Sequence, residues 1–329
     1  MESLNPKDLK AEARQRLAHA GCDPKKLILL NTGAVVVLGL LVNGLNFFLN
    51  HQIGSTGGLS GLGMRSALQT VQSLMSYAST LVTPFWAAGL LFCFIGIVRD
   101  TSVGPGSMLQ GFRRFPKILS FSLFQGLLLL LILFPVVYLS SILYMFTPLS
   151  SSFAEALTPL MESGELISAS GVINLDLIPQ EVLLKGTLPI ILVFLALYIP
   201  AYLFLRYTLH MGPYLILTDS VRGGFQAIAV STMLMRGHRK ELFKLDLSYW
   251  WYYVLEGLAL CTLYLDVILP LLRIELPVNP TAAFFLTLVI YSVLELGLHL
   301  WKKDEHDTAF VLAYECIATP PQDTGVISL

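Results

Sequence analysis

Residues 118–146 read ILSFSLFQGLLLLLILFPVVYLSSILYMF and contain no Asp, Glu, Lys or Arg. A helix needs about 20 mostly apolar residues to cross about 30 Å of hydrocarbon. This stretch is therefore long enough to span a bilayer. Pro135 lies inside it, and such a proline is tolerated where neighbouring groups satisfy the freed backbone.

Five further segments share this character. The predicted spans are Leu27–Asn50, Val71–Val98, Ile118–Phe146, Thr187–Leu205, Leu247–Leu271 and Thr281–Trp301. The 329-residue chain is 55% hydrophobic and only 13% charged, whereas a soluble domain carries about 25% charged residues. The sequence therefore predicts an all-α integral membrane bundle of six transmembrane helices, with short interfacial helices between them.

Basic residues set the orientation. Four alternate segments, beginning with the N-terminal one, hold 18 of the 21 Lys and Arg residues, and the others hold Arg65, Lys185 and Arg273. Cytoplasmic segments carry an excess of Lys and Arg. We expect a cell-membrane protein with both termini in the cytoplasm. Its parts are a cytoplasmic amphipathic lead-in (1–26), a membrane domain (27–301) and a cytoplasmic tail (302–329).

Residues 5–20 are predicted to form a helix. Asn5 is a suitable cap and Pro6 suits the first turn. Leu9, Ala13 and Leu17 recur four residues apart and form a narrow apolar stripe. This pattern fits a helix on the cytoplasmic leaflet, and it equally fits a solvated lead-in.

The segment between the fourth and fifth predicted spans contains a second interfacial helix. Asp219 or Ser220 is a candidate cap, the helix runs to about Arg236, and Gly237 is a candidate stop. Its predicted apolar face consists of Val221, Phe225, Ile228, Ala229, Thr232 and Met233.

A basic elbow follows this helix, formed by Arg236, His238, Arg239 and Lys240. Basic groups beside a membrane helix attract anionic headgroups, so the elbow is expected to contact inner-leaflet lipid. Aromatic residues then begin the fifth predicted span, as is typical of the membrane interface. They are Tyr249, Trp250, Trp251, Tyr252 and Tyr253.

Two segments are expected on the outer side. His51–Gly63 is predicted to be a flexible loop because it is glycine-rich. It does not match the pattern of a phosphate-binding loop. Residues 147–186 carry five acidic residues. Such a segment fits a solvated loop, and the alternative is a vestibule that attracts cations.

Four ionisable residues lie inside predicted spans: Glu256, Glu295, His299 and Asp266. Glu256 is expected about ten residues into the fifth span, near mid-bilayer, and Glu295 and His299 share one helix face. Charged groups in hydrocarbon are costly and therefore pair, meet water or take up a proton. One interpretation is a proton or cation relay through Glu256 and Glu295. The other is polar glue between helices.

No other chemistry is indicated. Glu295 and His299 are too few ligands for a metal site, and no set of nucleophile, acid and base lies at one depth. We therefore expect no metal, no cofactor, no nucleic acid and no enzymatic activity. Gly89, Cys93 and Gly96 form a small-residue face, which predicts close packing of another helix from this chain or a second copy.

Five stretches carry a family resemblance: LKAEAR (9–14), GFRRF (111–115), MGPYLILTD (211–219), MRGHRKELFKLDLS (235–248) and AYE (313–315). In this order they resemble a bacterial family of polytopic membrane proteins known only as domain of unknown function nine-seven-five. The resemblance implies a multi-pass fold and no assigned activity, and segment 147–186 is longer than the family's usual one. The sequence favours a scaffold, accessory or envelope-stress protein, with a membrane or homo-oligomeric partner. The alternative is a small-solute or ion transporter that uses intramembrane carboxylates.

Overall fold

The structure of the chain, a computed structural model, describes residues 5–55, 61–148, 150–151, 154–155, 158, 180–265 and 280–318. Within these ranges it does not describe the side chains of residues 50–55, 61–65, 180–188, 264 and 280–282. Every regular element in the described ranges is a helix, which confirms the all-α class. The chain divides into unit 1 (Met1–Ser122 and His210–Leu329) and unit 2 (Leu123–Leu209).

The long helices follow the predicted spans. They are α2 (Pro24–Ser55), α3 (Gly61–Val98), α5 (Phe115–Met145), α7 (Gln180–Leu209) and α13 (Pro280–Leu298). Within the described residues, five stretches are long and apolar enough to cross a membrane. These stretches are Pro24–Leu49, Ser66–Val98, Phe115–Met145, Pro189–Leu217 and Ala283–Ala318. Pro84, Pro135 and Pro200 lie inside helices, as expected.

The fifth predicted span differs most. The described helix there is α11 (Trp250–Cys261), which continues as the short η3 (Thr262–Tyr264). The predicted start, Leu247, instead ends α10 (Arg239–Leu247). A helix of 12 residues is shorter than a bilayer needs, and residues 266–279 lie outside the described ranges.

The glycine-rich segment is more helical than predicted. α2 extends to Ser55 and α3 begins at Gly61, so helix enters His51–Gly63 from both sides. Glycine costs about 1 kcal/mol in a helix, and continued backbone hydrogen bonding in long apolar helices outweighs this cost. The prediction of a loop over the whole segment was wrong in its extent.

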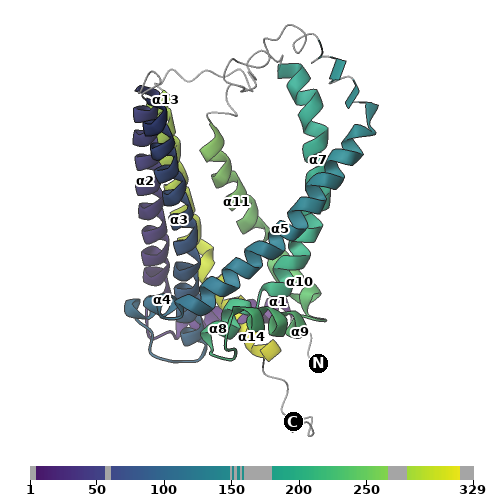
Figure 1. Cartoon of the computed structure of the whole chain (residues 1–329). Helices are drawn as coiled ribbons and strands as arrows, with labels where there is room; N and C mark the ends of the chain where they lie inside the picture. The colour runs from purple at the N-terminus through teal and green to yellow at the C-terminus, as the bar shows by residue number, and fades with distance from the viewer. Residues whose placement is uncertain are drawn as a thin grey trace. The chain divides into compact units, whose positions relative to one another are not determined.

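Short helices gather at one end of unit 1, and we call this set the base layer (Figure 1). Its members are α1 (Pro6–Ala18), α4 (Gln110–Arg113), α8 (Gly212–Leu217), α9 (Gly224–Leu234), α10 and α14 (Asp304–Ala318). α1 packs on α14 and α3, α8 packs on α9, and α14 also contacts α10.

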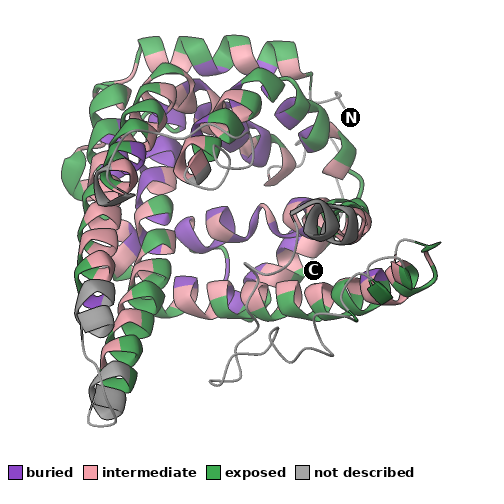
Figure 2. Ribbon diagram, turned by 90° about the horizontal axis from the view of Figure 1, so that it is seen from above, coloured by how far each residue is buried: buried purple, intermediate pink, exposed green. Residues whose placement is uncertain are grey.

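The most completely buried side chains belong to the base layer, to the residues that flank its helices, and to the start of α2 and the end of α3. Met211, Met235, Leu242, Val311 and Thr308 have no exposed surface. Apart from α3, of which about half is buried, the long helices mostly expose large apolar side chains; exposed residues are green in Figure 2. Exposed apolar faces on long helices suit a lipid environment, whereas the base layer is packed like a soluble domain.

α1 begins and packs for reasons that the sequence partly predicts. Asn5 caps it by accepting a hydrogen bond from the Lys7 backbone N–H at 3.2 Å. Leu9 is 6% exposed and Ala13 is fully buried, because the helix packs on α14 and α3. The predicted helix is confirmed, but the chain itself covers its apolar stripe.

Small residues allow close packing on α3, as predicted. A Cβ atom added to Gly89 would lie 1.9 Å from the Met108 carbonyl oxygen of η1 (Pro105–Leu109). One added to Gly96 would lie 2.3 Å from the Val103 side chain, and Cys93 is fully buried. The seam is therefore filled from within this chain.

α9 begins later than predicted. Asp219 has a positive φ of 54° and does not cap the helix, which starts at Gly224 and ends at Leu234. Gly224 packs against the start of α5, where its N–H donates to Ser120 Oγ at 3.2 Å. Small residues thus face inward, while Phe225 and Met233 of the predicted apolar face stay exposed.

Unit 2 contains the greater part of α5 and all of α7. Phe194, Tyr198 and Tyr202 stack in sequence along α7, with ring centroids 5.3 and 5.8 Å apart. Most of the acidic segment 147–186 lies outside the described residues, so the predictions about it stay predictions.

Candidate functional site

Glu256 lies on α11, six residues after the helix begins at Trp250. At 1.5 Å per residue this offset is about 9 Å. The carboxyl is therefore closer to the base-layer end of its helix than a start at Leu247 predicts. Its side chain is 46% exposed on unit 1.

His299 is the partner of Glu256. It begins a π-helical turn, η4 (His299–Lys303), that joins α13 to α14; such turns are rare and frequent at functional sites. Its Nδ1 lies 3.0 Å from Thr32 Oγ1 on α2, and its Nε2 lies 3.8 Å from Glu256 Oε1. The imidazole, 9% exposed, bridges α2 and α11.

The other predicted site residues are not part of this pair. Glu295 lies one turn after Tyr291 on its own helix, and among the described residues the ion-pair partner of Glu256 is His299. Asp266 lies outside the described residues. In the part of the chain that the structure describes, no three His, Cys, Asp or Glu side chains group to hold a metal.

A second polar cluster surrounds His306 on α14. Its Nδ1 lies 2.8 Å from Asp307 Oδ1, and its Nε2 lies 2.8 Å from the Tyr253 hydroxyl. Nε2 also lies 3.5 Å from Asp246 Oδ1 on α10, and the Tyr253 hydroxyl donates to the same carboxylate. The Asp246 and His306 side chains are only 6% and 14% exposed.

Aromatic rings enclose this histidine. The rings of Tyr249, Tyr252 and Phe310 have centroids 5.1, 5.9 and 4.7 Å from the His306 ring. Aromatic faces stabilise a nearby cation, and the two carboxylates add to this effect. The cluster can therefore hold a proton on His306.

Sequence reasoning missed the His306 cluster. It assigned Tyr249, Tyr252 and Tyr253 to a membrane-interface belt, but Tyr249 and Tyr252 are only 3% and 6% exposed. The signal that could have found the cluster is the Asp246–Tyr253 interval of seven residues, which would put both on one face if the helix were continuous.

An ion-pair group ties α1 to α14. Arg14 donates to both carboxylate oxygens of Glu305, at 3.0 and 3.1 Å, and Lys302 donates at 2.6 Å. Hydrogen bonding to Glu305 raises the pKa of the Arg14 guanidinium. Lys10 donates to the Ser248 carbonyl at 2.7 Å, so two polar contacts fasten α1 along one side of its buried stripe.

Asp219 forms a separate latch. Arg114 and Lys117 donate to its two carboxylate oxygens at 2.6 and 2.9 Å. These hydrogen bonds lower the pKa of Asp219 to about 2. They also explain why Asp219 does not cap α9, because its carboxylate is already occupied by residues about 100 positions earlier.

The basic elbow forms the turn between α9 and α10. Gly237 has a φ of 100°, as expected for a helix-stop glycine, and His238 lies 3.0 Å from Glu241. Arg236 and Lys240 are exposed, and Arg239 is half-buried. The elbow is thus accessible, and lipid contact there stays a prediction.

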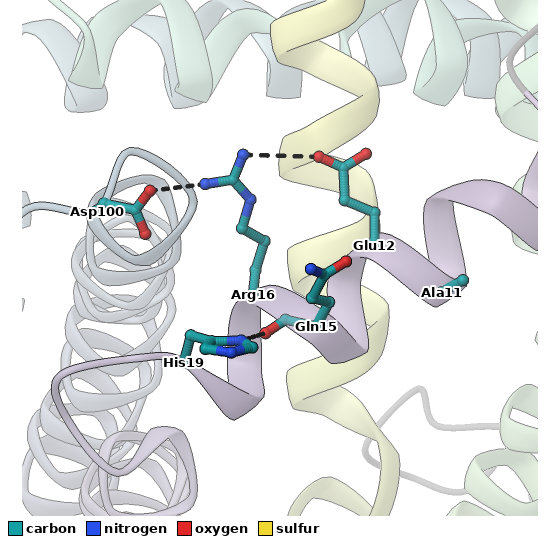
Figure 3. A pocket seen from close by; sticks show the side chains of 6 residues that line it. All are labelled: Ala11, Glu12, Gln15, Arg16, His19 and Asp100. Carbon is teal, nitrogen blue, oxygen red and sulfur yellow. Dashed lines mark hydrogen bonds and ion pairs between the residues drawn. The ribbon is translucent and has the colours of Figure 1, made fainter.

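A polar notch of about 520 Å³ lies beside α1 (Figure 3). Arg16 crosses it, 2.7 Å from Asp100 and 3.7 Å from Glu12, while His19 bonds to the Gln15 carbonyl at 2.8 Å. Arg16 is paired with both carboxylates of the notch, so its guanidinium is not free to bind an anion.

These features define the class of the protein as a helical membrane protein. Its clusters of acidic and basic side chains, around His299 and His306, lie beside the base layer of unit 1. The chain belongs to the family described as "Protein of unknown function (DUF975)", which matches residues 4–301. This confirms the family that the sequence motifs indicated. No curated protein and no solved structure matches the chain.

Proposed function

We propose that this chain is a multi-pass cell-membrane protein without a catalytic role, acting as a scaffold or accessory subunit through its base layer. The observation that carries the proposal is the contrast in packing within unit 1. Base-layer residues such as Ile216 and Val311 are fully buried, whereas long helices expose apolar side chains such as Leu41 and Leu74, 65% and 61% exposed.

Ion pairs between helices of the base layer and the end of α3 support this role. Arg14–Glu305 ties α1 to α14, Arg16–Asp100 ties α1 to the end of α3, and Arg99–Glu315 ties the same end to α14. Single exposed ion pairs stabilise little, but together they define one relative placement of three helices. A rigid layer of this kind suits attachment of another protein.

We further propose six spans, with both termini and the base layer in the cytoplasm. Five helices in the described ranges are long enough by themselves, and the sixth span would be α11 with the residues that follow it. An even number of spans agrees with the distribution of Lys and Arg. The exposed Trp250 and Trp251 would then mark the inner interface, beside Lys240 and Lys244.

Anionic lipid is the second proposed partner. Trp side chains favour the interface and basic side chains favour anionic headgroups. Both kinds are exposed around the elbow and at the start of α11. Transport is the alternative function, and the Glu256–His299 pair is the observation that favours it.

One experiment separates the scaffold from the transporter. A photo-crosslinking residue is placed in cells at exposed base-layer positions Glu12 and Gln226, and at Leu131 on α5 as the control. A scaffold predicts a discrete protein adduct from the base-layer sites and not from Leu131. It also predicts no cation or proton flux above empty vesicles in proteoliposomes. Flux that the Glu256→Gln variant loses, with only lipid adducts, would contradict the scaffold and establish transport.

A further inference from the structure

The hydrogen bonds around His306 fix the protonation state of its ring. The Tyr253 hydroxyl has a single proton and donates it to Asp246. The Tyr253 oxygen, 2.8 Å from Nε2 of His306, therefore accepts the Nε2 proton. On the other side of the ring, Nδ1 lies 2.8 Å from a carboxylate oxygen of Asp307, which also accepts. Both ring nitrogens are thus donors, and a histidine with two N–H groups carries a positive charge.

The neighbouring charges agree with this assignment. Burial raises the pKa of Asp307, but the hydrogen bond from His306 and the charge of Lys303 lower it overall, so the carboxyl group is ionised. Burial lowers the pKa of His306, but hydrogen bonds with Asp246 and Asp307 outweigh this effect and raise the pKa above its ordinary value of 6.5. The ring is therefore an imidazolium between two carboxylates.

The charged ring connects three helices of unit 1. His306 and Asp307 belong to α14, Asp246 belongs to α10 and Tyr253 belongs to α11. We propose that these four residues form a pH-sensitive clasp, in which protonated His306 holds α14 against α10 and α11 and the neutral ring releases them. The clasp is a regulatory device that goes beyond the scaffold role and does not depend on it.

Loss of the ring proton weakens the clasp in two ways. The Asp246 and His306 side chains are only 6% and 14% exposed, so little water is present to replace the lost charge. Removing one partner of a buried ion pair is strongly destabilising, because the other charge stays buried. In addition, Tyr253 cannot donate its one proton to Asp246 and to a neutral Nε2 at the same time, so one hydrogen bond of the cluster is lost.

The groups around the clasp favour the charged ring. On other helices that pack on α14, the basic groups Lys10, Arg14 and Arg99 donate to other acceptors, and Lys25 acts on Asp304. Carboxylates near a histidine favour its charged form. The titratable groups that face or act on the clasp from α10, α11, η4 and α14 are Asp246, Tyr249, Tyr252, Tyr253, Glu256, His299, Lys303 and Asp307.

The direction of the pH dependence follows from the raised pKa of His306. A group whose pKa is raised on folding stabilises the fold fully below its ordinary pKa, here 6.5. It loses this contribution as the pH rises through the folded value. The clasp is therefore closed below pH 6.5 and opens on the alkaline side. Between that pH and the midpoint of His306, the open fraction should rise about tenfold for each pH unit.

Two measurements on the full chain in lipid nanodiscs test the clasp. Nitrogen-15 NMR of histidine-labelled protein reports how many ring nitrogens of His306 are protonated. Its signal is the one that His306→Gln removes and Asp246→Asn shifts. Deuterium exchange in α10 and α14, corrected for the pH dependence of the chemical exchange rate, reports opening. We expect two protonated ring nitrogens below pH 6.5, and exchange that rises about tenfold per pH unit up to the NMR midpoint.

Matched variants separate the clasp from a general loss of stability. Asp246→Asn should lower the midpoint of His306 by about one pH unit or more, because it removes an opposite charge. Glu241→Gln changes a carboxylate on the same helix that pairs with His238, and it should leave the midpoint unchanged. His306→Gln should abolish the pH dependence of exchange, whereas His19→Gln, at an exposed position, should retain it.

Two results would overturn the proposal, and both come from the wild-type chain. The first is a His306 ring with only one protonated nitrogen below pH 6.5. The second is a ring that loses its proton above that pH while exchange in α10 and α14 stays unchanged through the midpoint. Neither result bears on crosslinking from the base layer, so the scaffold role can fail or stand separately.

Discussion

Replacing Gly89 by Ala tests the close packing of η1 on α3. In an open helix this change stabilises by about 1 kcal/mol, because alanine has the higher helix propensity. At Gly89 the new Cβ would lie 1.9 Å from the Met108 carbonyl oxygen, and Met108 itself is only 2% exposed. The clash is with backbone atoms of Met108, which cannot move aside as the end of a flexible side chain can. The whole of η1 must therefore shift. Overpacking of this kind costs about 1–3 kcal/mol.

The assay is thermal unfolding in detergent, followed by tryptophan fluorescence. The propensity gain offsets part of the overpacking cost. The net loss of about 1 kcal/mol lowers Tm by roughly 2–4 °C, at about 2–4 °C per kcal/mol. Gly39→Ala is the matched control, because a Cβ there meets nothing within 4 Å, and it should leave Tm unchanged or raise it. Equal Tm values for both variants would refute the packing of η1 on α3.

Three further predictions concern the polar contacts. Glu305→Ala should lower the free energy of unfolding in urea by about 2 kcal/mol, because it removes charged hydrogen bonds to Arg14 and Lys302. Glu12→Ala, which removes an exposed ion pair, should lower it by less than about 0.5 kcal/mol. Equal losses in the two variants would exclude a special role for Glu305. The pKa of Asp219 in the folded protein is lowered from 3.8 to about 2. Its ion pairs with Arg114 and Lys117 therefore stabilise the fold fully above pH 3.8, and this stabilisation is lost as the pH falls toward 2. Asp219→Asn should therefore flatten the fall in Tm across that window, and a pH profile identical to wild type would contradict the latch. Replacing the three basic elbow residues by Gln should weaken anionic-lipid retention in native mass spectrometry by about 1 kcal/mol per residue. Replacing the three predicted outer basic residues should not weaken it. Equal retention by both variants would mean that the elbow orients the chain in the membrane but does not bind anionic lipid. The elbow set is Arg236, Arg239 and Lys240, and the control set is Arg65, Lys185 and Arg273.

Local properties of the sequence predicted much of the fold. Apolar length located the long helices, and Asn5 and Gly237 take the roles that helix capping and stopping require. The small residues at Gly89 and Gly96 predicted a packing seam, which the structure confirms. Each of these features depends on residues close together in the chain, so its physical cause is visible without a partner.

Pairings between distant segments could not be predicted in the same way. Helical spacing put Glu295 and His299 on one face, but it does not say which of them meets α11; the π-helical turn that begins at His299 changes that relation. Asp219 is a suitable helix cap by residue type, but its carboxylate forms ion pairs with Arg114 and Lys117 instead. The His306 cluster likewise exists only because α14 packs beside α10 and α11.

The most direct test of the central claim is cysteine labelling in intact cells. The native Cys22, Cys93, Cys261 and Cys316 are first replaced, and single cysteines are then introduced at Ser55, Ser168 and Gln226. Gln226 is exposed on α9 of the base layer. A membrane-impermeant maleimide should label the cysteines at 55 and 168 in intact cells, and the one at 226 only after permeabilisation. Labelling at 226 in intact cells would contradict a cytoplasmic base layer carried by six membrane-spanning helices.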